Sequence, residues 1–195
     1  MKNLFLVITA LILTVGVSHA QTTPNQAKVK VNIELNPFQT IEIGSGAGTN
    51  GAITTGYGDE LTLEYKSADD YKKGVEKNVL KQLKVTSVGS GYKILATLSD
   101  NAQFNKVNGS GDAKVDASQL LKIAVGNKSS MDAAASMDLG SFGTTSGAES
   151  SVFDQELDVK YTGKAITDVN LLKKVLNDKT QAKYSIDVVY TIAAN

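Results

Sequence analysis

The side chains that could do chemistry in this chain are carboxylates, lysines and tyrosines. Its 195 residues include 20 acids, 20 bases that are all lysine, and seven tyrosines, but no Cys and no Trp. The only histidine is His19, close to the N-terminus. A sequence without His, Cys or Arg beyond that point has no imidazole base, no His-activated nucleophile and no His or Cys metal site.

His19 belongs to a segment that we expect to be removed. Lys2, an apolar run from Leu4 to Val17 and the small residues of Ser18-His19-Ala20 predict a secretory signal peptide over residues 1–20. A polar leader, residues 21–27, follows it. We therefore expect a secreted protein without a transmembrane segment in the mature chain, passing through the periplasm to the cell surface. We expect no catalytic residue, no metal and no cofactor.

Two loops contain residues of the types that bind ligands. Residues 46–51 match G-x-G-x-x-G, but a dinucleotide site needs a helix to begin there, and further glycines follow instead. Residues 99–116 contain Asp and Asn that leave a Ca²⁺ site open, although their spacing does not match a calcium loop. The charges of both signs are interspersed, so no basic stripe predicts nucleic-acid binding.

The elements that would position any site are mostly strands. Apolar and polar residues alternate over several short segments, and Gly-rich turns separate them. This pattern predicts an all-β, immunoglobulin-like sandwich of about eight short strands in one domain, residues 28–195. We expect strands at 61–65 and 118–126, and a hairpin of 82–88 with 92–98. Residues 126–150 are expected to be a long surface loop with at most one edge strand.

One segment has helical rather than strand spacing. Val169, Leu172, Val175 and Leu176 recur at helical intervals after Thr167, a residue type that caps helices. The sequence predicts one short helix at about 167–177.

The most regular alternation in the chain is KVKVNIEL, residues 28–35. One face of this predicted strand is apolar and the other is polar, and Pro37 interrupts the pattern before TIEI. Two interpretations are open: an edge strand of its own sandwich, or an arm that enters the sheet of another copy. The four apolar residues that would serve as donor side chains are Val29, Val31, Ile33 and Leu35.

This arrangement resembles the secreted fimbrial subunits of Gram-negative bacteria, in the chaperone–usher and spore-coat-U classes. It is still more similar to small secreted proteins with an LNPFQTI-like strand, here Leu35 to Ile41, and a YTIAA-like terminal strand, here Tyr190 to Ala194. The resemblance implies donor-strand complementation, in which the N-terminal extension of one subunit fills a groove of the next. Such subunits often have a disulfide, which this chain cannot form.

The resemblance also implies a set of partners. These are further copies or related subunits in a filament, a periplasmic chaperone and an outer-membrane assembly protein. A core strand lining the acceptor region would be formed by Ile186, Val188, Tyr190 and Ile192. The alternative function is a soluble module that binds carbohydrate or protein through the long loops at 44–58 and 126–150.

Overall fold

The structure is a computed structural model that describes residues 28–48, 56–143, 147–178 and 180–195. The expected signal peptide and leader, and parts of the two long loops, lie outside the described residues. The chain divides between Leu35 and Asn36, so residues 28–35 and the part from Asn36 onward are described separately. Among the described residues, no helix has the length and apolar character needed to cross a membrane.

Residues 36–195 form a mostly antiparallel β structure. The described part holds eleven strands: β1 Phe38–Ile43, β2 Val75–Val88, β3 Tyr92–Leu98, β4 Gln103–Asn108, β5 Lys114–Asp116, β6 Leu121–Val125, β7 Met131–Asp132, β8 Ser136–Phe142, β9 Val152–Gly163, β10 Lys183–Ser185 and β11 Val188–Ala194. Short helices α2 Ala68–Lys73, α3 Ala117–Leu120 and α4 Val169–Val175 lie between them, with 3₁₀ turns at Ser99–Asn101 and Ala148–Ser150.

The strands are arranged in three sheets. A five-stranded sheet has the order β1-β2-β9-β6-β7, and the two three-stranded sheets have the orders β11-β3-β8 and β10-β4-β5. All pairings are antiparallel. The prediction of an all-β, sandwich-like fold is confirmed. The prediction of about eight strands was too low, because several expected loops contain short strands.

The core follows the alternation of the longest strands. Tyr92, Ile94, Ala96 and Leu98 on β3 are all buried, as are Leu157, Val159 and Tyr161 on β9. Side chains at every second position of a strand point to the same face, so these two strands each contribute one continuous apolar face. They pack into one core with residues of β2, β6 and β8.

The predicted hairpin of 82–88 with 92–98 was wrong. Over Leu83–Val88, β2 already has β1 on one edge and β9 on the other. A strand has only two edges for backbone hydrogen bonds, so β3 cannot pair with this part of β2. Instead β3 pairs with β11 and β8, and the turn at 89–91 carries the chain into another sheet.

Three other segments differ from their predicted structure. Residues 61–65 alternate like a strand but join no ladder. The expected strand at 118–126 begins with α3, because the Asp116 side chain accepts a hydrogen bond from the backbone N–H of Ser118 and caps that helix. Residues 126–150 contain β7, which pairs with the neighbouring β6, and β8, which pairs with β3 about 40–50 residues earlier in the chain.

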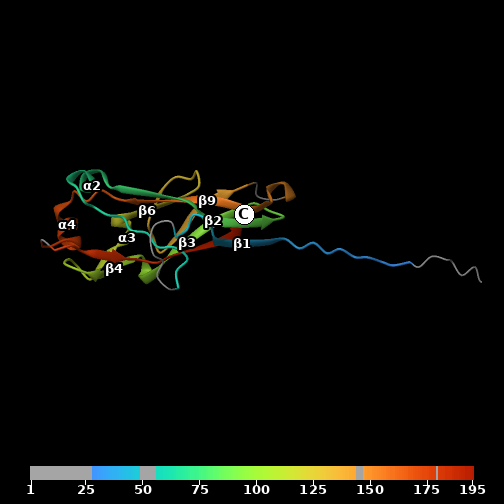
Figure 1. Cartoon of the computed structure of the whole chain (residues 1–195), viewed down its shortest axis with the longest axis horizontal. Coiled ribbons are helices and arrows are strands. Elements are labelled where there is room, and N and C mark those ends of the chain that lie inside the picture. The colour runs from blue at the N-terminus through green and yellow to red at the C-terminus, as the bar shows by residue number, and fades with distance from the viewer. Residues whose placement is uncertain (1–27, 49–55, 144–146, 179) are drawn as a thin grey trace, which may run out of the picture. The chain divides into compact units, whose positions relative to one another are not determined.

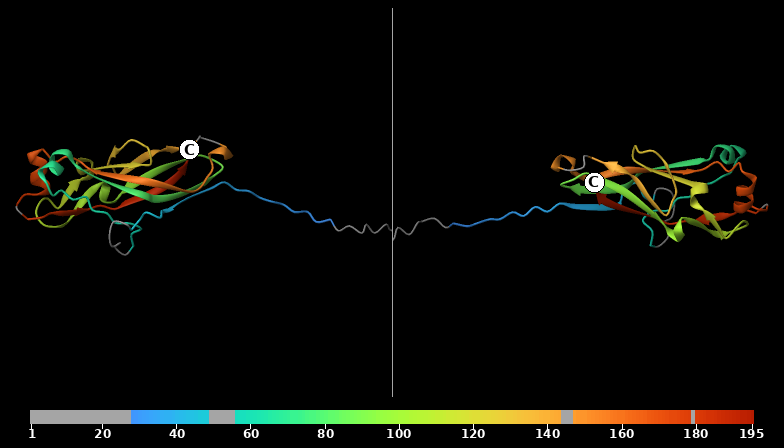
Figure 2. Two further views of the ribbon diagram at one scale, coloured as in Figure 1. Left: turned by 45° about the horizontal axis from the view of Figure 1, so that its top comes forward. Right: turned by 180° about the vertical axis from the view of Figure 1, so that it is seen from behind.

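The helices cover one end of this domain. In Figure 1, α2 and α4 lie together at the end away from the C-terminus, and both views in Figure 2 show the same placement. A second apolar cluster lies here, around Val115, Ile166 and Val175. The predicted helix is confirmed at Val169–Val175, although Asp168 rather than Thr167 caps it.

The buried tyrosines predict a loss of stability in alkali. Burial raises the pKa of Tyr65, Tyr92 and Tyr161 to about 12, and it raises that of Tyr190 well above its usual value near 10. The unfolded chain releases these protons at about pH 10, whereas the folded chain still holds them. The free energy of unfolding should therefore be constant up to about pH 9 and fall steeply between about pH 10 and 12. Urea unfolding across this range tests the prediction, and an equal stability at about pH 8 and 11 would contradict it.

Candidate strand-exchange site

The N-terminal segment, residues 28–35, forms no strand in the single chain. Its four alternating apolar side chains are 76–88% exposed: Val29, Val31, Ile33 and Leu35. The prediction of a strand here is thus not realised in this chain by itself. The first residue to join a sheet is Phe38, opposite Val88.

Backbone pairing with β2 begins directly after Pro37. Proline has no N–H and cannot complete a ladder, so pairing begins only after it. Beyond it, β1 pairs with β2 from Phe38 to Ile43, and Gln39 Nε2 donates to the Ser87 hydroxyl at 3.0 Å. The alternating residues around Pro37 therefore adopt two different structures. Those before Pro37 form an exposed segment without a ladder, and those after it form an edge strand.

The residues proposed as an acceptor strand lie on β11 and just before it. Ile186, Val188, Tyr190 and Ile192 are all partly buried and pack against the main core. β11 pairs with β3 along its whole length and is an edge strand of its sheet. Their contribution to the core is thus visible, while a role in accepting another strand remains a proposal.

The predicted strand at 61–65 is part of an extended edge segment, which we define as residues 59–65. Leu61 and Leu63 pack against the main core, and Tyr65 packs against the second apolar cluster. The Tyr65 hydroxyl donates to the backbone oxygen of Lys164 at 2.7 Å. Side chains, rather than a backbone ladder, therefore hold this segment in place.

A chain of hydrogen bonds ties the edge segment to two sheets. Gln82 Nε2 donates to Asp59 Oδ2 at 2.6 Å, and the Tyr161 hydroxyl donates to Gln82 Oε1 at 2.9 Å. The Tyr190 hydroxyl lies 2.8 Å from that of Tyr161. The series runs from the edge segment through β2 and β9 to β11, and it satisfies polar atoms that would otherwise be buried without partners.

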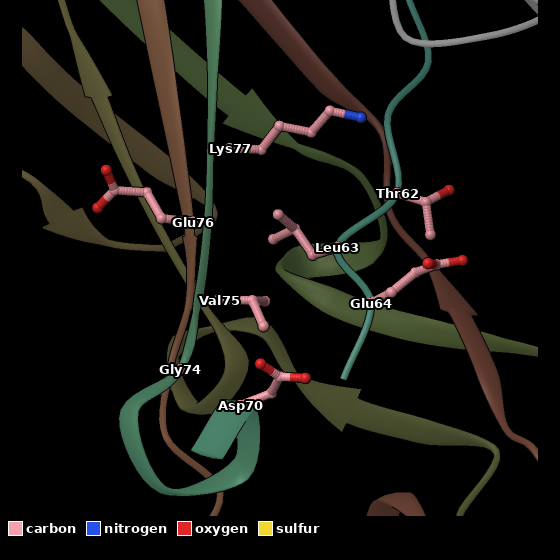
Figure 3. Close-up of a pocket in the computed structure, with 8 residues that line it drawn as sticks. All are labelled: Thr62, Leu63, Glu64, Asp70, Gly74, Val75, Glu76 and Lys77. Atoms are coloured by element: carbon pink, nitrogen blue, oxygen red, sulfur yellow. The ribbon is translucent and has the colours of Figure 1, made fainter. Parts of the chain in front are cut away.

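The edge segment and the first part of β2 leave a groove between them. This edge groove has a volume of about 400 Å³ and is lined by Thr62, Leu63, Glu64, Asp70, Gly74, Val75, Glu76 and Lys77. Figure 3 shows residues 62–64 on one side and Gly74–Lys77 on the other, with Leu63 and Val75 directed toward the space between. Among the described residues, no backbone hydrogen bond joins the two sides.

β1 is shorter than β2, so the first part of β2 has an unpaired edge. β1 ends opposite Leu83, and only Gly44 and Gly46 extend its hydrogen bonds, to the backbone oxygens of Gln82 and Lys81. Next to them β2 bulges: Lys81 has a φ of 54°, and its N–H bonds to Asp158 Oδ1. Residues 75–79 of β2 therefore pair with β9 but have no strand on their other edge within the described part.

A second hollow lies over charged residues of β2, β9 and the turn after β6. It has a volume of about 390 Å³, and Glu76 and Lys160 there form an ion pair at 3.4 Å. In the described part of the chain, no three acidic or histidine side chains gather as a metal site would require. Asp100 and Asp116, from the loop considered for Ca²⁺, instead bond to Asn105 and to the backbone of Ser118.

Comparison with protein-family models and with curated proteins finds no match for this chain. The geometry of the chain therefore carries the functional argument alone.

The sequence did not reveal the edge groove. The alternation in 61–65 was visible, but the absence of a partner for it was not, because pairing depends on where β1 ends. Gly74 does not point to the groove either: it has a φ of 85°, and a Cβ at this position would lie 2.3 Å from the backbone oxygen of Gly163, on the side of β2 that pairs with β9. A glycine required at the start of a strand marks a close approach of two backbones.

The hydrogen-bond series predicts that Gln82→Met will loosen the edge segment. The substitution leaves Asp59 and Tyr161 without a shared partner, so we expect a loss of about 1–3 kcal/mol in the free energy of unfolding. Hydrogen exchange should rise in residues 59–65. Gln155→Met is the matched control, because Gln155 accepts from Tyr92 and does not touch this segment. Equal exchange in residues 59–65 of both variants would contradict the role given to Gln82.

Proposed function

We propose that this protein is a structural subunit that assembles by β-strand donation, as in a cell-surface filament. The N-terminal segment of one copy would form a strand in a sheet of another copy. The observation that carries the proposal is the exposure of Val29, Val31, Ile33 and Leu35 on a segment whose backbone joins no sheet. An alternating segment of this kind is suited to strand addition, where backbone bonds give affinity and alternate side chains give specificity.

Burial of the four apolar side chains in a strand-exchanged interface would contribute a large free energy of association. Burying one Val, Leu or Ile side chain contributes about 1.5–3 kcal/mol, and four such side chains are exposed here. Contiguous exposed apolar surface is uncommon in monomeric proteins and marks sites of interaction. An exposed strand edge on another copy supplies the hydrogen-bond partners that this segment does not have.

The rest of the chain supports the proposal because its core does not need this segment. Among the described residues, every buried apolar side chain lies between Val79 and Val175, and the residues packed around them begin at Ile41. A domain that folds without its N-terminal segment leaves that segment available to a neighbour.

The first prediction from the proposal concerns deletion. A chain starting at Asn36 should keep the free energy of unfolding of the chain starting at Gln21 to within about 0.5 kcal/mol, because no core contact is lost. It should no longer self-associate, yet it should bind a synthetic peptide of residues 28–35. Sedimentation and fluorescence anisotropy measure these effects. If the shortened chain unfolds, the segment belongs to its own sheet and the proposal fails.

A matched pair of variants tests which face of the segment matters. Ile33→Ser with Leu35→Ser removes two apolar side chains and should weaken self-association by at least about tenfold, since each buried side chain contributes more than 1 kcal/mol. Asn32→Ser with Glu34→Ser changes the same part of the segment on its polar face and should have a much smaller effect. Equal losses in both variants would show that the alternation has no role.

A further inference from the structure

We infer that the open edge of β2, residues 75–79, is the acceptor site and that its occupant is the N-terminal segment of a second copy. This inference rests on the proposed function and names the partner surface for it. Residues 75–79 pair with β9 on one side, and among the described residues they make no other backbone hydrogen bond. Successive residues of a strand direct their N–H and C=O groups to opposite edges, so alternate residues here present unpaired groups to an incoming strand.

The open edge is regular, whereas two other unpaired edges in the described part are bulged. From Val75 to Val79 the pairing with β9 runs without a register shift. β8 contains Gly140 with a φ of 120°, beside a shift in its register against β3. The part of β9 that β6 does not cover contains Asp154 with a φ of 51°, again beside a register shift. Bulges twist an edge away from an incoming strand, so these two edges are protected and the open edge of β2 is not.

The edge strands β1 and β11 leave no room for a further strand between them. Their Cα atoms approach within 8 Å. A strand between them would need them about 9.5 Å apart, which is twice the spacing of paired strands. The remaining edge strands of the described part are β5, β7 and β10, which have only two or three residues each. The open edge of β2 is therefore the best match for the alternating residues of the N-terminal segment.

The side chains along the open edge match the alternation of the segment. Val79 is buried and Val75 is half-buried on the inner face, whereas Glu76 is exposed on the outer face. An added strand keeps this two-sided pattern, so its apolar residues would continue the inner face. There they would lie at the mouth of the edge groove, where the side chains of Leu63 and Val75 face one another (Figure 3). The Lys77 side chain extends across the groove and has to swing aside (Figure 3).

Glu76 supplies a charge for the lysines of the segment. Its side chain is 55% exposed and lies 3.4 Å from Lys160 of β9. Because β9 lies on one side of β2, Glu76 remains accessible from the other side to a cation on an added strand. The segment brings Lys28 and Lys30 on its polar face. By contrast β11, VVYTIAA, has no charged residue to meet these lysines.

The same charge favours one orientation. Residues 29–33 have the length of the open edge and fit beside it in either direction with their apolar side chains inward. In the parallel arrangement Lys30 lies beside Glu76 and Asn32 beside Asn78, whereas the antiparallel arrangement places Asn32 beside Glu76. Opposite charges on neighbouring strands stabilise a sheet, so the segment runs parallel to β2.

Charge reversal gives one test. Glu76→Lys places a lysine beside the incoming Lys30, and at low salt it should weaken self-association roughly fivefold, because like charges on neighbouring strands repel. Lys30→Glu in the same chain should restore most of the loss. Glu42→Lys is the matched control, because Glu42 is also an exposed acid that pairs with a lysine of the next strand, Lys84. An equal loss from Glu76→Lys and Glu42→Lys, with no rescue, would overturn the assignment of the open edge.

Cross-linking gives the decisive test, because the natural chain has no cysteine. A chain starting at Gln21 with Asn32→Cys and an isotope-labelled chain with Asn78→Cys are unfolded in urea, mixed, refolded together and oxidised. The matched mixture carries Thr191→Cys, an exposed residue of β11, in place of Asn78→Cys. Mass spectrometry should find disulfides between positions 32 and 78 of different copies at least about tenfold above those between 32 and 191, since a disulfide needs Cα atoms within about 7 Å.

The other outcomes separate the two proposals. Disulfides from 32 to 191 without those from 32 to 78 would overturn the open edge as acceptor and leave strand donation standing, with β11 as the acceptor. Neither disulfide would also overturn the open edge, and it would overturn strand donation as well if the protein sediments as a monomer.

Discussion

The pairing of β2 with β9 is the interaction on which the rest of the structure depends. It runs from Val75 to Ser87 and brings the two longest strands together at the centre of the five-stranded sheet. β1 covers only the later part of the free edge of β2. Because both edges of β2 are occupied over Leu83–Val88, β3 cannot pair with it there. The turn at 89–91 therefore leads into a second sheet, in which β3 pairs with β11 and β8. The unpaired first part of β2 follows from the same mismatch in length.

Near the unpaired part of β2, side chains rather than backbone hydrogen bonds hold the neighbouring segment in place. The edge segment lies beside the unpaired part of β2, and Asp59, Gln82 and Tyr161 connect it to the sandwich. Exposed strand edges invite pairing with other chains, and proteins usually cover or charge them.

Sequence alone predicted the features that depend on local pattern. The all-β class, the helix near 169–175 and the long strand β9 follow from the periodicity of apolar residues. The pairing partners do not, because register and strand ends depend on distant residues: 126–150 was expected to hold at most one edge strand but contains β7 and β8, and 61–65 was expected to be a strand but joins no ladder. Of the candidate site, the alternation of 28–35 was visible in the sequence, but its exposure and the groove were not. The absence of His, Cys and Arg beyond His19 set the expectation of assembly rather than catalysis.

The central claim is that residues 28–35 have no partner in the single chain and gain one in another copy. Amide hydrogen exchange measures this directly, because unpaired backbone amides exchange fast and paired ones are protected. In dilute protein that sediments as a monomer, the amides of Val29 to Leu35 should exchange as fast as those of an unstructured peptide. In concentrated, assembled protein they should be protected to the same degree as the amides of β9. Strong protection of these residues in the monomer would contradict the account.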